Sequence, residues 1–91
     1  MLQCEWDENK NIANKTKHKI SFEVAQYVFL DPAAKQTFDR NIGGEECWHM
    51  IGKIMDTVVV LVVYTECNGN TRIISARKAN KREKVLYHGT K

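Results

Sequence analysis

The stretch TVVVLVVYTECNGNTRIISAR, residues Thr57–Arg77, decides the fold class. Its first half is a continuous β-branched run, which is typical of a central strand buried on both faces. Asn68-Gly69 is a strong signal for a tight hairpin turn. The segment TRIISAR then returns as the partner strand. The stretch therefore predicts two antiparallel neighbours in the middle of a sheet.

Weaker strand signals lie upstream of this stretch. ECWHMIGKI, residues 46–54, alternates moderately and is predicted to be a strand. KQTFDR, residues 35–40, is a weaker strand candidate, and Gly43-Gly44 marks the loop between the two. The opening LQCEW is also strand-like. Three or four consecutive strands joined by short turns predict a meander.

Two helices are predicted before the strands and one after them. Asp7 caps the first helix, on which Ile12, Ala13 and Thr16 are expected to form a narrow buried stripe. Ser21 caps the second, which ends before Pro32. Its apolar face is Phe22, Ala25, Val28 and Phe29. Asn80 caps the third, with Glu83 at the capping-box position and Gly89 as a stop.

These elements predict one domain, residues 1–91, of the α+β class: a small antiparallel meander with helices packed on one face. The three cysteines are odd in number and the three histidines are far apart, so no disulfide framework, metal site or cofactor is predicted. The chain starts with no basic-then-apolar leader. Its longest apolar run is far shorter than the about 20 residues that span a bilayer. We therefore expect a cytoplasmic protein with no membrane partner.

Positive charge is concentrated at the C-terminal end. From Thr71 onward there is one acid, Glu83, against seven basic residues: Arg72, Arg77, Lys78, Lys81, Arg82, Lys84 and Lys91. A smaller basic group comprises Lys15, Lys17, His18 and Lys19. Such clustering indicates an anionic partner, often nucleic acid, and a solvated basic tail is the equal alternative. Alternation puts Arg72 and Arg77 on opposite faces unless their strand bends between them.

The cations Arg77, Lys78, Lys81 and Arg82 lie close enough in sequence to form one phosphate-binding patch. Metal-free RNA cleavage needs such cations together with a base and an acid that move two protons. The candidates for those proton transfers are Glu66, Tyr64, His18 and Tyr87. Each also has a structural reading: an ion pair for Glu66, the core for Tyr64, a helix end for His18 and a helix anchor for Tyr87. Glu83 is interpreted as a helix cap. Trp6 and Trp48 are candidates for base stacking or for core packing.

In order along the chain, the motifs E-W-D at residues 5–7, N-x-x-K-H at 14–18, S-F-E-x-A at 21–25 and R-I-I-S-A-R at 72–77 resemble the BrnT family of bacterial toxins. The resemblance runs from about Glu5 to Tyr87. It implies a RelE-like fold and a metal-independent endoribonuclease that cleaves RNA and inhibits translation. It also implies a BrnA-like ribbon-helix-helix antitoxin, through which alone the complex would contact operator DNA.

The resemblance carries site residues onto this chain. The matching positions are Lys17, His18, Tyr64, Thr65, Glu66, Arg72, Ser75, Arg77 and Arg82. The predicted catalytic set is Lys17, His18, Tyr64, Glu66, Arg72, Arg77 and Arg82. The predicted phosphate-binding set is Arg72, Arg77, Lys78, Lys81 and Arg82.

The chain also departs from the family pattern. Cys47 and Cys67 stand where the family usually has arginine, and Lys19 stands where it often has glycine. A thiol cannot stabilise anionic charge as a guanidinium does. The alternative function is therefore a catalytically weakened homologue that serves as antitoxin partner and transcriptional corepressor.

Overall fold

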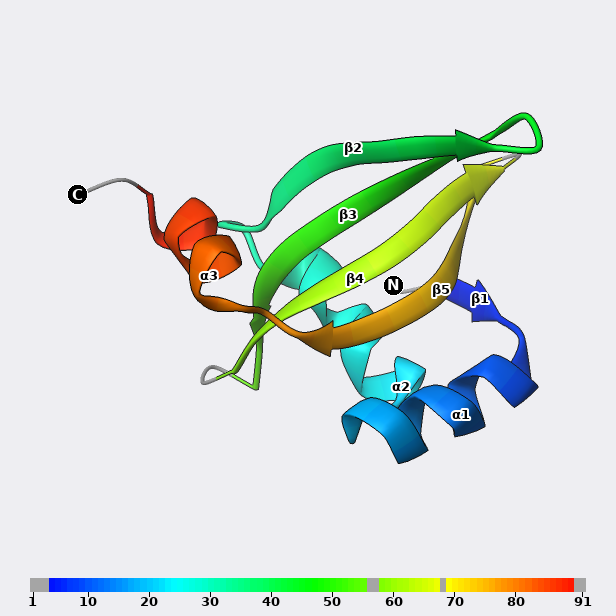
Figure 1. Ribbon diagram of the computed structural model, residues 1–91, viewed down its shortest axis with the longest axis horizontal. Helices are drawn as coiled ribbons and strands as arrows, with labels where there is room; N and C mark the ends of the chain where they lie inside the picture. Colours follow the sequence, from blue (N-terminus) through cyan, green and yellow to red (C-terminus); the bar gives the residue numbers. More distant parts are fainter. Residues whose placement is uncertain (1–3, 56–57, 68, 90–91) are drawn as a thin grey trace.

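The computed structural model describes residues 4–55, 58–67 and 69–89, and it forms one mixed sheet with helices on both sides (Figure 1). In chain order the elements are β1 (Cys4–Trp6), α1 (Glu8–His18), α2 (Phe22–Ala25), the 3-10 helix η1 (Gln26–Leu30), β2 (Lys35–Ile42), β3 (Glu45–Ile54), β4 (Val58–Cys67), β5 (Asn70–Lys78) and α3 (Lys81–His88).

The strand order is β1-β5-β4-β3-β2, so β4 has the central position that its sequence predicts. Strands β2 to β5 form the predicted antiparallel meander, and the α+β class is confirmed. Gly69, at φ 80°, and the pairing of Cys67 with Asn70 confirm the β4–β5 hairpin, although Asn68 lies outside the described residues. The sheet differs from a purely antiparallel one because β1 pairs in parallel with β5.

One face of the sheet is covered by α1 and α2 (Figure 1). Phe22, Ala25 and Val28 are fully buried there against Val60 and Val62, which confirms the predicted apolar face of the second helix. Gly52 of β3 makes this packing possible. A Cβ at that position would lie 2.6 Å from Val28 Cγ2, so only glycine lets η1 approach β3 so closely.

The buried side of α1 is polar, and the prediction for this helix was wrong. Ile12 is 58% exposed and Ala13 and Thr16 are also exposed, whereas Asn11 and Asn14 are buried.

The reason lies in β5, whose edge beyond β1 is met by α1. The Asn14 amide donates to Ala76 O at 2.8 Å and accepts from Ala76 N at 3.1 Å. It also donates to Ile20 O at 2.9 Å. Asn14 therefore satisfies backbone groups that a further strand would otherwise pair.

The opposite face carries a second apolar cluster of Ile51, Val59, Leu61 and Ala79, against which Tyr87 of α3 packs. The predicted packing of helices on one face thus describes α1 and α2, while α3 covers one end of the other face. The predicted cap of α3 is confirmed: Asn80 and Glu83 form a capping box, and Gly89 ends the helix. We call the part of this second face beyond α3 the open face.

Candidate active site

A β-bulge brings Arg72 and Arg77 to the open face together. In the β4–β5 ladder Arg77 pairs with Leu61 and Arg72 pairs with Thr65, and the register shifts between these two pairs. Ile74 is the extra residue of β5. Paired residues of an antiparallel ladder project to the same side, so both arginines lie on the face of Leu61 and Thr65. The sequence predicted that Arg72 and Arg77 could share a face only if their strand bends between them, and this bulge is such an irregularity.

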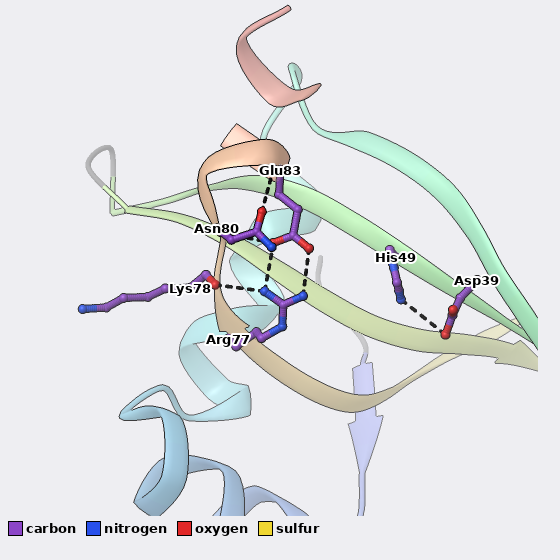
Figure 2. Close-up of polar contacts among 6 residues, drawn as sticks. All are labelled: Asp39, His49, Arg77, Lys78, Asn80 and Glu83. Atoms are coloured by element: carbon purple, nitrogen blue, oxygen red, sulfur yellow. Dashed lines mark hydrogen bonds and ion pairs between the residues drawn. The ribbon is translucent and has the colours of Figure 1, made fainter. Parts of the chain in front are cut away.

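Arg77 is held by Glu83 at the start of α3 (Figure 2). Arg77 Nη1 donates to Glu83 Oε1 at 2.9 Å, and Nη2 donates to Glu83 Oε2 at 2.8 Å. The same carboxylate accepts from Asn80 N at 2.9 Å. The pair is only partly exposed, and the Arg77 hydrogen bond lowers the pKa of Glu83 and outweighs the opposing effect of burial. A carboxylate held in its ionised form is a poor proton acceptor, so Glu83 orients Arg77.

The guanidinium of Arg77 has five N–H groups that can donate hydrogen bonds. Nη1 donates one N–H group to Glu83 and the other to Lys78 O at 3.2 Å, and Nη2 donates one N–H group to Glu83. The Nε–H and the remaining Nη2–H share one edge and make no hydrogen bond within the described residues. Two donors on one edge match two phosphate oxygens.

His49 of β3 lies on the same face and is paired with Asp39 of β2 (Figure 2). Nε2 of His49 is 3.3 Å from Oδ2 of Asp39. A register break between Phe38 and Arg40 makes Asp39 the extra residue of β2 and allows this contact. Burial acts to raise the pKa of Asp39, but the Arg40 hydrogen bond and the charges of His49 and Arg40 bring it below its ordinary value.

Beside the Arg77 hydrogen bond, which is the main cause, the charge of a protonated His49 makes a minor contribution to the lowered pKa of Glu83. A carboxylate at Nε2 favours the tautomer with its proton on Nε2, which leaves Nδ1 as a proton acceptor. His49 and Asp39 are absent from the predicted catalytic set. The alternation of β3 places His49 on one face with Cys47, but the bulge that brings Asp39 to it has no sequence signal.

Tyr64 and Glu66 lie away from this site. Tyr64 is buried on the face covered by α1 and α2, in edge contact with Phe29, and its hydroxyl accepts from Gln36 Nε2 at 2.5 Å. Burial is the main cause that raises the pKa of Tyr64. Of the two interpretations given for Tyr64, its burial agrees with the one that places it in the core. Glu66 is exposed and follows the alternation of Tyr64.

The other predicted residues lie in three further places. Lys17 and His18 end α1 and line a shallow pocket with Ile74 and Ser75. Lys78 extends away from Arg77 (Figure 2). Lys81 and Arg82 are exposed on α3, and within the described part of the chain their side chains make no hydrogen bond or ion pair. The structure therefore gathers Arg72 and Arg77, but not the whole predicted set, on one surface.

Both cysteine departures are on strands, as expected. Cys47 is 2% exposed and pairs with Arg40 on one side and Thr65 on the other. Because Thr65 in turn pairs with Arg72, a row of residues crosses the open face with Cys47 between two arginines. Cys67 lies in β4 beside the hairpin, and its side chain is outside the described residues.

The remaining aromatic candidates have structural contacts. Trp6 packs edge-on against Phe22, and Trp48 packs in the same way against Phe38. The Tyr87 hydroxyl donates to Asp31 Oδ2 at 2.6 Å, which raises the pKa of Tyr87 to about 12 and agrees with its reading as a helix anchor.

No helix in the described ranges is long and apolar enough to cross a membrane. Nor do the described residues contain a group of three or more His, Cys, Asp or Glu side chains placed to hold a metal ion.

Comparison with known proteins gives two findings. The sequence model of the family described as "Ribonuclease toxin, BrnT, of type II toxin-antitoxin system" matches residues 6–83. The fold is similar to the crystal structure of the Brucella abortus ribonuclease toxin BrnT, with a TM-score of 0.67 and 20% sequence identity over 89% of this chain and 100% of that one. A search of curated protein sequences gave no significant match.

Proposed function

The chain belongs to the BrnT family of ribonuclease toxins of type II toxin–antitoxin systems, and on that premise we propose that it is a metal-independent endoribonuclease acting through its open face. The observation that carries the proposal is the two-donor edge of Arg77, unused within the described residues, on the same face as a histidine that is paired with a carboxylate. They supply the cation and the base that RNA cleavage without a metal requires, and water supplies the proton for the leaving oxygen.

The proposed reaction begins when Nδ1 of His49 takes the proton of a ribose 2′-hydroxyl. The 2′-oxygen bonds to the adjacent phosphorus, and the bond from phosphorus to the 5′-oxygen breaks. That oxygen takes a proton from water, and the hydroxide left behind takes the proton held by His49. Arg77 stabilises the negative charge that builds on the phosphoryl oxygens. Arg72 projects from the same face, with its Nη1 4.0 Å from Glu5 Oε2, and adds positive charge there. Asp39 holds His49, and Glu83 holds Arg77.

The other predicted residues keep narrower roles in this proposal. Lys78, Lys81 and Arg82 contact RNA phosphates away from the scissile bond. Lys17, His18, Tyr64 and Glu66 stay predicted site residues, and no chemical step is assigned to them. Tyr64 is buried on the face covered by α1 and α2, Glu66 follows its alternation, and Lys17 and His18 lie at the end of α1 beside β5.

The proposed partner is a BrnA-like ribbon-helix-helix antitoxin that neutralises the toxin in the cytoplasm. The complex would contact operator DNA only through the antitoxin. Inhibition of translation is the expected cellular outcome of RNA cleavage.

The second candidate function is a weakened homologue that acts as antitoxin partner and corepressor. One observation favours it: the buried Cys47 thiol lies on the open face, in the row between Arg40 and Thr65, where the family pattern has arginine. A neutral thiol there leaves that row without its central cation.

The deciding experiment incubates purified, antitoxin-free protein with RNA in the presence of EDTA. The expected result is cleavage that the antitoxin suppresses and that Arg77→Ala combined with Arg82→Ala abolishes. Full activity in that double variant would contradict the phosphate role. His49→Ala is expected to lower the cleavage rate about 100-fold or more, in the range of a lost general base. Ile12→Ala, which truncates an exposed side chain of α1, is the control for nonspecific effects of truncation to alanine.

The two cysteine positions separate the candidate functions. Restoring arginine in Cys67→Arg is expected to raise the cleavage rate if the family cation is functionally missing. An unchanged rate would make that position peripheral. No cleavage by the wild-type chain, together with operator binding that needs both proteins, would favour the corepressor.

A further inference from the structure

A second basic region lies where α3 meets the ends of β3, β4 and β5. A pocket of about 430 Å³ at this place is lined by Lys53, Lys78, Lys84 and His88, with Val58 and Val59 as its apolar lining. Lys84 and His88 are one helical turn apart and so project from the same side of α3. None of these residues belongs to the Arg77–Glu83 or His49–Asp39 pairs.

This pocket continues into a second one through shared residues. Lys78 and Val58 also line a pocket of about 360 Å³ whose other cationic residues are Lys15 and Lys19. The two basic groups that are separate in the sequence therefore meet at Lys78. We call the six residues Lys15, Lys19, Lys53, Lys78, Lys84 and His88 the basic band. Among the described residues, no carboxylate lines either pocket.

Carboxylates near the band compensate little of its charge. Asp31 offsets part of the charge of Lys53, a member of the band. Glu23 acts on Lys15. In the described part of the chain, the side chains of Lys19, Lys78 and Lys84 make no ion pair. Such an uncompensated surface attracts a polyanion.

We propose that the basic band binds backbone phosphates of single-stranded RNA outside the scissile site. The inference rests on the proposed function for the identity of the ligand. Arg77 and Lys78 are consecutive in β5, and the Lys78 side chain extends away from Arg77 (Figure 2) and lines both pockets of the band. A strand whose scissile phosphate is bound at Arg77 therefore continues into a surface of cations. Phosphate contacts of this kind supply affinity without reading sequence.

The test measures binding of a short 2′-O-methyl oligoribonucleotide, which lacks the attacking hydroxyl and cannot be cleaved. Lys53→Gln/Lys84→Gln is expected to weaken binding about tenfold and to lower the slope of log K against log salt by about 1.4, since each lost phosphate contact on a single strand contributes about 0.7. The control Asn9→Asp/Lys10→Gln removes the same net charge at the start of α1 and is expected to bind like wild type. Adding Lys15→Gln to the first variant is expected to weaken binding further.

Two further probes identify the anion. Inorganic phosphate at matched ionic strength is expected to compete only weakly, because it fills one position of an extended band. Competition by free phosphate as effective as that by the oligonucleotide would reassign the band to a small anion. An oligoglutamate peptide that binds more tightly than the oligonucleotide, with the same loss in the variant, would reassign it to an acidic protein segment.

The outcomes also separate this inference from the proposed function. Cleavage by wild type together with equal oligonucleotide affinity in the band and control variants would overturn the band and leave the enzyme. No cleavage by wild type together with the expected loss of affinity would overturn the enzyme and leave the band as a nucleic-acid surface.

Discussion

The two faces of the central sheet use the same strands for different purposes. On the face covered by α1 and α2, residues of β4 and β5 pack against Phe22 and Val28 in the main apolar cluster. On the open face, the intervening positions of β3 and β5 present His49 and Arg77. The bulge at Ile74 serves both faces, because it brings Ile73 and Ala76 to the covered face and Arg72 and Arg77 to the open face. The bulge at Asp39 brings its carboxylate to His49 on the open face.

The covered face is expected to show the largest single effect on stability. Phe22→Ala removes a fully buried ring that meets Trp6 edge-on, and it should lower the free energy of unfolding by about 3–5 kcal/mol. Urea denaturation followed by circular dichroism measures this loss. Leu30→Ala, 61% exposed in the same helical segment, is the control and should change stability by about 0.5 kcal/mol or less. Similar losses in both variants would mean that the covered face is not the core.

The open face is expected to respond in activity more than in stability. Arg77→Lys keeps a positive charge but loses the two-donor edge, so the RNA cleavage rate should fall about 100-fold. The free energy of unfolding should fall by about 1 kcal/mol, because lysine still pairs with Glu83. Cleavage assays and urea denaturation on the same preparations separate the two quantities. A variant with equal loss in both would show that Arg77 is structural.

The third prediction concerns the hydrogen bonds of Asn14 to the edge of β5. Asn14→Ala leaves the N–H and C=O of Ala76 and the C=O of Ile20 without their side-chain partner in a buried place. The expected cost is about 2 kcal/mol, since unpaired buried polar groups carry their full desolvation penalty. Hydrogen exchange should show faster exchange at the Ala76 amide than at the Val62 amide in the same variant. Unchanged protection at Ala76 would contradict the strand-like role of Asn14.

Most of the secondary structure can be predicted from the sequence, because it follows from residue propensities, helix caps and apolar spacing within short segments. The β-branched run of β4, the Asp7 and Asn80 caps and the apolar spacing of Phe22, Ala25 and Val28 all lead to the elements observed. The parallel pairing of β1 is not readable, because it depends on how α1 and α2 carry the chain across the sheet.

The site is less readable than the fold, because its key contacts join distant positions. Arg77 and its charged neighbourhood have a sequence signal, but its pairing with Glu83 coexists with the capping role that the sequence predicts. The His49–Asp39 contact needs a bulge in β2, and no signal in the sequence predicted it. Tyr64 was predicted both as a candidate for proton transfer and, by the resemblance, as a catalytic residue, whereas the structure buries it on the covered face.

The smallest expected effect concerns the contact that ties α3 to the loop after η1. Tyr87→Phe removes the hydrogen bond to Asp31 and should cost about 1 kcal/mol at neutral pH. Burial acts to raise the pKa of Asp31, but hydrogen bonds from Tyr87 and backbone amides bring it below its ordinary value. The stability from Asp31 is therefore present above the unfolded pKa and is lost as pH falls through the folded one. The variant should show a smaller loss in acid than wild type.

The same pair gives a second pH window at the alkaline end. The hydrogen bond to Asp31 raises the pKa of Tyr87 from 10.0 to about 12, so its stabilising contribution is complete below the lower value and is lost as pH rises to the upper one. Tyr87→Phe has no phenol to ionise and should lack this part of the alkaline loss. Urea denaturation across both windows measures the difference, with Tyr27→Phe, an exposed tyrosine, as control. Identical pH profiles for wild type and Tyr87→Phe would mean that the hydrogen bond to Asp31 does not hold α3. The apolar contacts of Tyr87 with the cluster of Ile51 and Leu61 would then be sufficient to fix α3 at the border of the open face.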